Sequence, residues 1–141
     1  MSGSGDIPRW RRRLDEFGRM ADLLARTEKI QADRPLTEAE EAGTVQFFEM
    51  SVELAWKTLA LRTRESGVLL HIMSPVPIFR EAARLGFIDD PDRWMEAVER
   101  RNIMSRTYDP AAYRLLIADI GTTFLPMITG LRRTLRDIDA A

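Results

Sequence analysis

The sequence has no cysteine, and its only histidine is His71. A chain without cysteine can form neither disulfides nor thiolate metal sites. No histidine and carboxylate residues occur at the spacing of metal ligands, which argues against metal catalysis. We therefore expect neither a metal nor a cofactor. A lone histidine between apolar residues is more often packed or capping than catalytic, and we favour that interpretation for His71.

Several motifs of self-contained enzymes are also missing. There is no phosphate-binding glycine loop, no Walker pattern and no Gly-x-Ser-x-Gly turn, so the chain does not resemble a nucleotide hydrolase or an acyl transferase. No apolar run reaches the length of a membrane span, and the first residues lack the apolar core of a signal peptide. These absences predict a soluble cytoplasmic protein. The 141 residues suit one domain, which we place at 7–141 after a flexible tail at 1–6.

The charges nearly balance, with a formal net charge of -1. A chain of this kind has no global field that would attract nucleic acid or membranes, so any charged binding surface must be local. One such cluster, near the N-terminus, is a solvated helix face, or a surface for RNA or an acidic partner. Its members are Arg9, Arg11, Arg12, Arg13 and Arg19.

Apolar residues recur at helical spacing along the chain, and no segment shows the alternation of a strand. The sequence therefore predicts an all-α protein, an antiparallel bundle of about five helices. Thr37 and Glu40 have the spacing of a capping box, while Asp90 before Pro91 suits another helix start. The predicted helices run from about Pro8 to Ala32, from Thr37 to Gly67, from Pro75 to Gly86, from Pro91 through Arg101, and from Pro110 to Asp139.

Two of these helices have further features. The apolar residues of the second helix extend so far around its axis that we expect it to be central or at a subunit interface. Trp56 beside Lys57 could form a stacking platform, but an aromatic residue on an apolar stripe is more often part of the core. In the last helix, Pro126 should cause a kink, and Gly121 and Gly130 could allow close helix packing.

The segment from Arg101 to Tyr108 carries an arginine and an asparagine, then Arg106 and the tyrosine. Considered locally, it is the solvated end of a helix, where cations complement the macrodipole. At about 100° per residue, Arg101 and Tyr108 fall on nearly the same face and Arg106 lies well around from them. If the helix persists through Tyr108, that residue and Arg101 share one cleft.

In combination, spaced segments of the chain resemble the nucleotidyltransferase substrate-binding proteins, toxin-like members of the HEPN superfamily that pair with minimal nucleotidyltransferases. The resemblance covers most of the span from residue 46 to 108. The segments that carry it are Gln46-Phe47-Phe48-Glu49, Glu53-Leu54-Ala55-Trp56-Lys57, Ser74-Pro75, Arg80-Glu81-Ala82, Gly86-Phe87-Ile88-Asp89, Trp94, and Arg101-Asn102 through Tyr108.

This resemblance implies a helical homodimer whose composite cleft cleaves RNA without a metal. The family signature is an arginine, four residues, a histidine, one residue and a tyrosine. Arg101 takes the arginine position, with Asn102 beside it as a further candidate catalytic residue. Tyr108 takes the tyrosine position, to which the partner nucleotidyltransferase, the antitoxin, would attach AMP. The added phosphates would block RNA entry by their negative charge.

The chain departs from the signature at one position, because Arg106 stands where the family has histidine. Histidine can take and give a proton near neutral pH, whereas arginine cannot be deprotonated there and has no acceptor. We expect Arg106 to strengthen phosphate binding and to impair cleavage, while Arg101 could still stabilise a charged intermediate. Two alternatives remain open. The protein is a non-catalytic binding or scaffold subunit of a nucleotidyltransferase complex, or Arg106 is an inactivating change.

Overall fold

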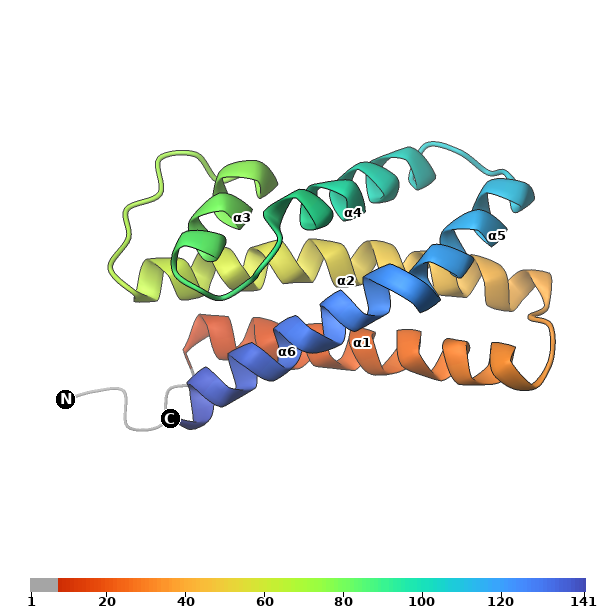
Figure 1. Ribbon diagram of the computed structural model, residues 1–141, viewed down its shortest axis with the longest axis horizontal. Coiled ribbons are helices and arrows are strands. Elements are labelled where there is room, and N and C mark those ends of the chain that lie inside the picture. Colours follow the sequence, from red (N-terminus) through yellow and green to blue (C-terminus); the bar gives the residue numbers. More distant parts are fainter. Residues whose placement is uncertain (1–7) are drawn as a thin grey trace.

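The computed structural model describes residues 8–141, and all regular structure within them is helical (Figure 1). The predicted all-α class is confirmed, and the predicted tail at 1–6 lies outside the described residues. The last three elements follow one another without a break and form a single long helix, so the bundle has five helices, as predicted. In chain order the elements are α1 (Arg9–Asp33), α2 (Glu38–Glu65), α3 (Pro75–Arg84), α4 (Pro91–Met104), α5 (Pro110–Asp119), the π-helix η1 (Ile120–Phe124) and α6 (Leu125–Ala140).

The two longest helices, α1 and α2, lie side by side in opposite directions (Figure 1). The turn between them ends in the predicted capping box. The Thr37 hydroxyl accepts the Glu40 amide at 3.1 Å, and the Glu40 carboxylate accepts the Thr37 amide at 2.8 Å. Arg34 donates to the same carboxylate at 2.8 Å, so the end of α1 is tied to the start of α2.

The centre of the bundle is α2, which contacts every other α-helix of the described chain. Its residues Phe48, Val52 and Leu59 have no accessible surface, and Phe48 packs on Phe124 with ring centroids 5.3 Å apart. The sequence prediction of a central helix is therefore confirmed. Trp56, expected in the core, is only partly buried.

Two glycines end helices as their conformation requires. Gly67 after α2 and Gly86 after α3 have φ of 88° and 82°, a region that other residues rarely adopt. Between Gly67 and α3, the loop turns its side chains outward, with Leu69 78% and Ile72 62% exposed. His71 is exposed with them. Packing, the first of the two roles expected for His71, is therefore wrong, although its neighbour Leu70 packs against the core.

The long C-terminal helix changes geometry just before Pro126. Proline has no amide hydrogen and its ring clashes with the carbonyl four residues earlier. The π-helical segment Ile120–Phe124 lies at this position, so the disturbance predicted there takes the form of a π turn. Helix packing is close at Gly121, as predicted, because a Cβ at this position would lie 2.5 Å from the Glu28 side chain of α1. Gly130 has no such contact.

By length and composition, the continuous helix from Pro110 to Ala140 is long and apolar enough to cross a membrane. This corrects the expectation that no stretch reaches such a length. A buried core helix has the same character, and Ile117, Phe124 and Leu135 of this helix are buried in the bundle core. Of the apolar stretch of this helix, 33% is buried inside the bundle.

The capping box predicts a pH-dependent contribution to stability. The pKa of Glu40 is lowered to about 2, first by the hydrogen bond from Arg34 and then by the Thr37 amide. A carboxyl group with a depressed folded-state pKa stabilises the fold above its ordinary pKa and loses that effect as the pH falls through the folded value. We expect Glu40→Gln to lower the melting temperature at pH 7, and this difference to disappear as the pH approaches 2. Thermal unfolding at a series of pH values tests this.

The matched control is Glu38→Gln, which removes an exposed carboxylate from the same first turn of α2. An equal loss of melting temperature in the two variants at pH 7 would contradict the assignment.

Candidate functional site

The residues singled out in the sequence lie at the end of α4 and in the linker that follows. Arg101 and Asn102 belong to the last turn, and the helix ends at Met104 with Ser105 as its cap. Tyr108 therefore lies outside the helix, in the short connection to α5. The helical projection that placed Arg101 and Tyr108 on one face does not apply, because its condition, a helix through Tyr108, is not met.

Arg101 is held against the central helix by a charged contact. One terminal nitrogen donates to Glu53 Oε1 of α2 at 2.7 Å, and the other donates to Asn102 Oδ1 at 3.2 Å. The Arg101 Nε is buried and has no hydrogen-bond partner among residues 8–141. The side chain is 32% exposed. Arg101 is thus a fixed, partly accessible cation whose charge is already shared with a carboxylate.

A cavity of about 330 Å³ surrounds this ion pair, between α1, α2 and α4. Besides Arg101 it is lined by Glu16, Gln46, Glu49, Met50, Glu53 and Leu54. Burial raises the pKa of Glu49, and the nearby charge of Arg101 opposes that rise. We name this cavity the Arg101 cleft. It places one cation among three carboxylates.

Sequence reasoning did not identify Glu49 and Glu53 as members of the site. Both occur in segments that carry the family resemblance, and their spacing of four places them on one face of a helix. That spacing was a usable signal. That spacing did not reveal the cation that pairs with Glu53, because Arg101 is 48 residues further along the chain.

Arg106 and Tyr108 do not line the Arg101 cleft. Both are exposed, Tyr108 by 75%. The Tyr108 ring meets Tyr113 of α5 edge to face, with centroids 5.6 Å apart, and its hydroxyl-bearing ring remains accessible. Asp109 then starts α5 by accepting the Ala111 amide at 3.0 Å. Within one chain, the structure brings Arg101 and Asn102 together but separates them from Arg106 and Tyr108 by the end of the helix.

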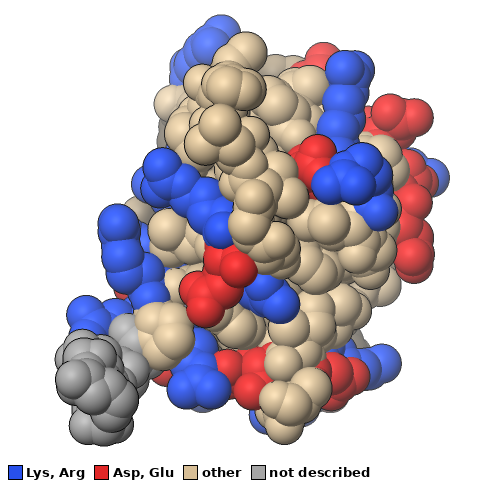
Figure 2. Space-filling model, turned by 90° about the vertical axis from the view of Figure 1, so that its left-hand side faces the viewer, with Lys and Arg blue, Asp and Glu red and all other residues tan. Residues whose placement is uncertain are grey.

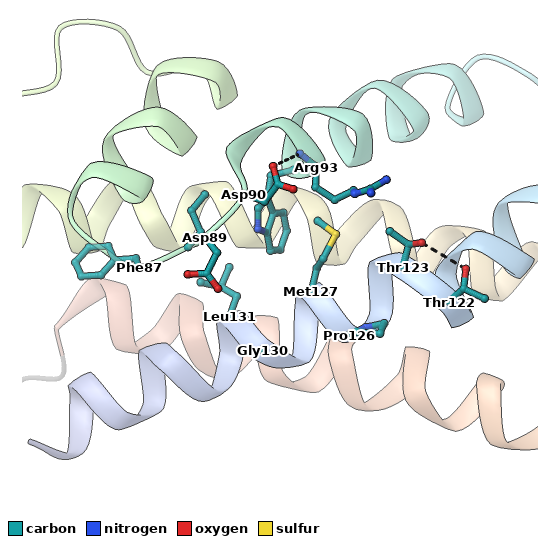
Figure 3. Close-up of a pocket in the computed structure, with 12 residues that line it drawn as sticks. Phe87, Asp89, Asp90, Arg93, Thr122, Thr123, Pro126, Met127, Gly130 and Leu131 are labelled. Carbon is teal, nitrogen blue, oxygen red and sulfur yellow. Dashed lines mark hydrogen bonds between the residues drawn. The ribbon is translucent and has the colours of Figure 1, made fainter.

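A larger cavity, of about 500 Å³, lies between the start of α4 and the η1–α6 region (Figure 3). Some of its polar groups are engaged locally: Asp90 accepts the Arg93 amide at 3.2 Å, and the hydroxyls of Thr122 and Thr123 are 3.4 Å apart. None of the site residues predicted from the sequence lines it. In the described part of the chain, no group of three or more histidine, aspartate or glutamate residues could hold a metal ion.

Comparisons with known proteins identify the family of the chain. Residues 12–137 match the family described as nucleotidyltransferase substrate binding protein like. Because the match covers most of the chain, the protein belongs to this family. The resemblance inferred from the sequence is confirmed.

Two relatives from Haemophilus influenzae show what the chain is similar to. The probable ribonuclease HepT is 32% identical over 82 residues, which are 56% of this chain and 56% of that protein. The matched part thus spans about half the length of that relative. A solved structure, described as revealing the fold of a substrate binding domain of a nucleotidyltransferase, has a TM-score of 0.71 at 28% identity and covers 87% of this chain and 98% of its own.

The Arg101 cleft predicts a coupled titration. Because the Arg101 charge lowers the pKa of Glu49 against the effect of burial, Arg101→Met should raise that pKa further. Titration of the Glu49 side-chain carboxyl by NMR measures it. The control is Arg100→Met, because Arg100 pairs with Asp119 at 2.7 Å and does not line the Arg101 cleft. An equal shift, or none, in the two variants would refute the coupling.

Proposed function

We propose that this protein is the toxin-type subunit of a nucleotidyltransferase toxin-antitoxin pair, and that Tyr108 accepts AMP from the partner enzyme. The observation that carries the proposal is the position of Tyr108, which projects from a short linker with three quarters of its surface accessible. An acceptor must enter the active site of another protein, so it has to lie outside the packed bundle. Family membership supports the partner class.

The proposed modification transfers AMP from ATP to the phenol oxygen of Tyr108. The oxygen attacks the α-phosphorus, pyrophosphate leaves, and the phenol proton is released. The product carries a phosphodiester charge on the linker that also holds Arg106. That charge lies two residues from the exposed Arg106, where it would repel the backbone of an incoming RNA.

We also propose that the ancestral reaction is metal-independent RNA cleavage in a cleft shared by two copies of the chain, and that this chain performs it poorly. Arg101 can hold a phosphate, but Arg106 offers no group that takes a proton. Support for a shared cleft comes from exposed apolar side chains next to the site, Met50 in the Arg101 cleft and Ile103 beside Asn102. An apolar surface at this position suits contact with a second copy.

A second candidate is a non-catalytic subunit that binds or presents a substrate to the nucleotidyltransferase. The observation that favours it is the Arg101–Glu53 ion pair, because a phosphate must compete with a carboxylate already in place at 2.7 Å. The two candidates predict different rates of RNA cleavage by the Arg106→His variant.

The modification test uses the only two tyrosines of the chain. Incubation with the partner nucleotidyltransferase and ATP should add AMP units to the wild type and to Tyr113→Phe, but not to Tyr108→Phe. Intact mass spectrometry measures the product. The control is well matched, because Tyr113 lies in contact with Tyr108 but is partly buried on α5. Modification that persists in Tyr108→Phe would reject Tyr108 as the acceptor.

The cleavage test restores the missing proton acceptor. We expect Arg106→His to increase the rate of cleavage of single-stranded RNA by roughly a hundredfold or more, the typical contribution of a general acid-base. Gel analysis of a labelled oligonucleotide measures it. Arg106→Gln removes the same charge without supplying a titrating group and serves as control. If Arg106→His is as inactive as Arg106→Gln, the non-catalytic candidate is the better description.

A further inference from the structure

A third pocket, of about 230 Å³, lies between the first turns of α1 and the last turns of α2. It collects four of the positive side chains of a molecule whose net charge is -1. Among the described residues, no carboxylate lines it, in contrast to the three that line the Arg101 cleft. We name it the cationic pocket. Its charged residues are Arg9, Arg13, Lys57 and Arg64.

The carboxylates nearest to this pocket stand at its edge. Arg13 contacts Glu16 at 3.2 Å and Lys57 contacts Glu53 at 3.7 Å, and both glutamates line the neighbouring Arg101 cleft. The two cavities are therefore adjacent along the α1–α2 pair. A ligand chain that leaves the Arg101 cleft along these helices would enter the cationic pocket.

The remaining two cations, Arg9 and Arg64, make no salt bridge with residues 8–141. Arg64 lies in the last turn of α2, where its positive charge complements the negative end of the helix macrodipole. Arg9 has no such explanation, because a cation in the first turn of a helix opposes the macrodipole and the first turn of α1 holds no acidic residue. The helices of the pocket thus offset the charges of Arg13, Lys57 and Arg64 in part but not that of Arg9, and an anion in the pocket would offset the remainder.

The pocket also has an aromatic wall. Trp10 and Trp94 are 6% and 4% exposed, whereas Trp56 is only partly buried and lines the pocket next to Met73. An accessible indole in a groove of arginines is the combination that single-stranded nucleic acids require, with phosphates on the cations and a base stacked on the ring. An acidic protein segment would use the cations but would leave this wall without a partner.

Figure 2 views the end of the molecule at which α1 begins and α2 ends. On this face, positive side chains lie on both sides of an uncharged ridge, with acidic side chains beside some of them. We propose that the cationic pocket binds single-stranded RNA, with arginine forks on the backbone phosphates and one base stacked on Trp56. The proposal rests on RNA being the ligand of the proposed function, but it does not require that the RNA be cleaved.

The test measures binding, by fluorescence anisotropy of a labelled single-stranded RNA with the full chain at several salt concentrations. Arg9→Gln with Arg64→Gln should weaken binding at least tenfold and reduce the slope of log affinity against log salt by about 0.7 for each phosphate that the variant no longer neutralises. The control pair, Arg26→Gln with Arg133→Gln, removes two other exposed arginines of α1 and α6 and should bind like the wild type. Equal losses of affinity in the two double variants would overturn the proposal.

A third variant distinguishes RNA from an acidic protein partner. Trp56→Leu should weaken RNA binding roughly tenfold and abolish the quenching of tryptophan emission by RNA, because the other two tryptophans are buried. Polyglutamate of equal charge should neither quench nor depend on Trp56. If polyglutamate binds as tightly as RNA and Trp56→Leu changes neither, the pocket is a protein-docking surface and the proposal fails.

Failure here is distinguishable from failure of the proposed function. Pocket-dependent RNA binding without cleavage by Arg106→His would leave this inference standing and remove the nuclease proposal. Cleavage by Arg106→His with RNA binding unaffected by Arg9→Gln and Arg64→Gln would do the reverse.

Discussion

The burial of α2 on several faces is the constraint from which most of the structure follows. The consecutive residues Thr58, Leu59 and Ala60 are all buried, and because they project about 100° apart around the axis, α2 needs neighbours on more than one side. Every other α-helix of the described chain supplies one. The charged residues of α2 lie where those neighbours leave part of its surface open, since none of them is fully buried. Glu53 lies at one such position, where Arg101 of α4 reaches it. The core thus decides where the charged site can form.

The segment from Arg101 to Tyr108 has two halves with different physical properties. Arg101 and Asn102 are fixed on a helix and in contact with a carboxylate, so their charge is partly offset and their geometry is set. Arg106 and Tyr108 lie on the linker beyond the helix end, where they are exposed to solvent. A partner enzyme can address the second half without disturbing the packing that holds the first.

The small net charge of the chain conceals a separation of charge along α1 and α2. The Arg101 cleft contains three carboxylates around one guanidinium, whereas the adjacent pocket at the start of α1 has cations alone. Exposed charges interact weakly in water, but a concave surface with one sign of charge concentrates its field on a ligand. The distribution of the arginines therefore matters more for recognition than their number.

Much of the fold was predictable from the sequence because it depends on local spacing. Helical periodicity, the Thr37–Glu40 capping box and the breaks at proline and glycine predicted the five helices, since each of these signals acts within a few residues. The same local logic failed at His71, which is exposed in the loop after α2. Apolar neighbours in sequence say nothing about whether a loop turns toward the core or away from it.

The sequence by itself determined the family, the helical class and the one position at which the signature departs, because these are properties of residue identity and order. Only the tertiary structure decided which charges meet. It paired Arg101 with Glu53 across 48 positions, ended α4 before Tyr108, and placed Arg9 beside Lys57 and Arg64. The physical reason is that a Coulomb contact depends on distance in space, and that distance is set by how α1 and α4 pack on the central helix.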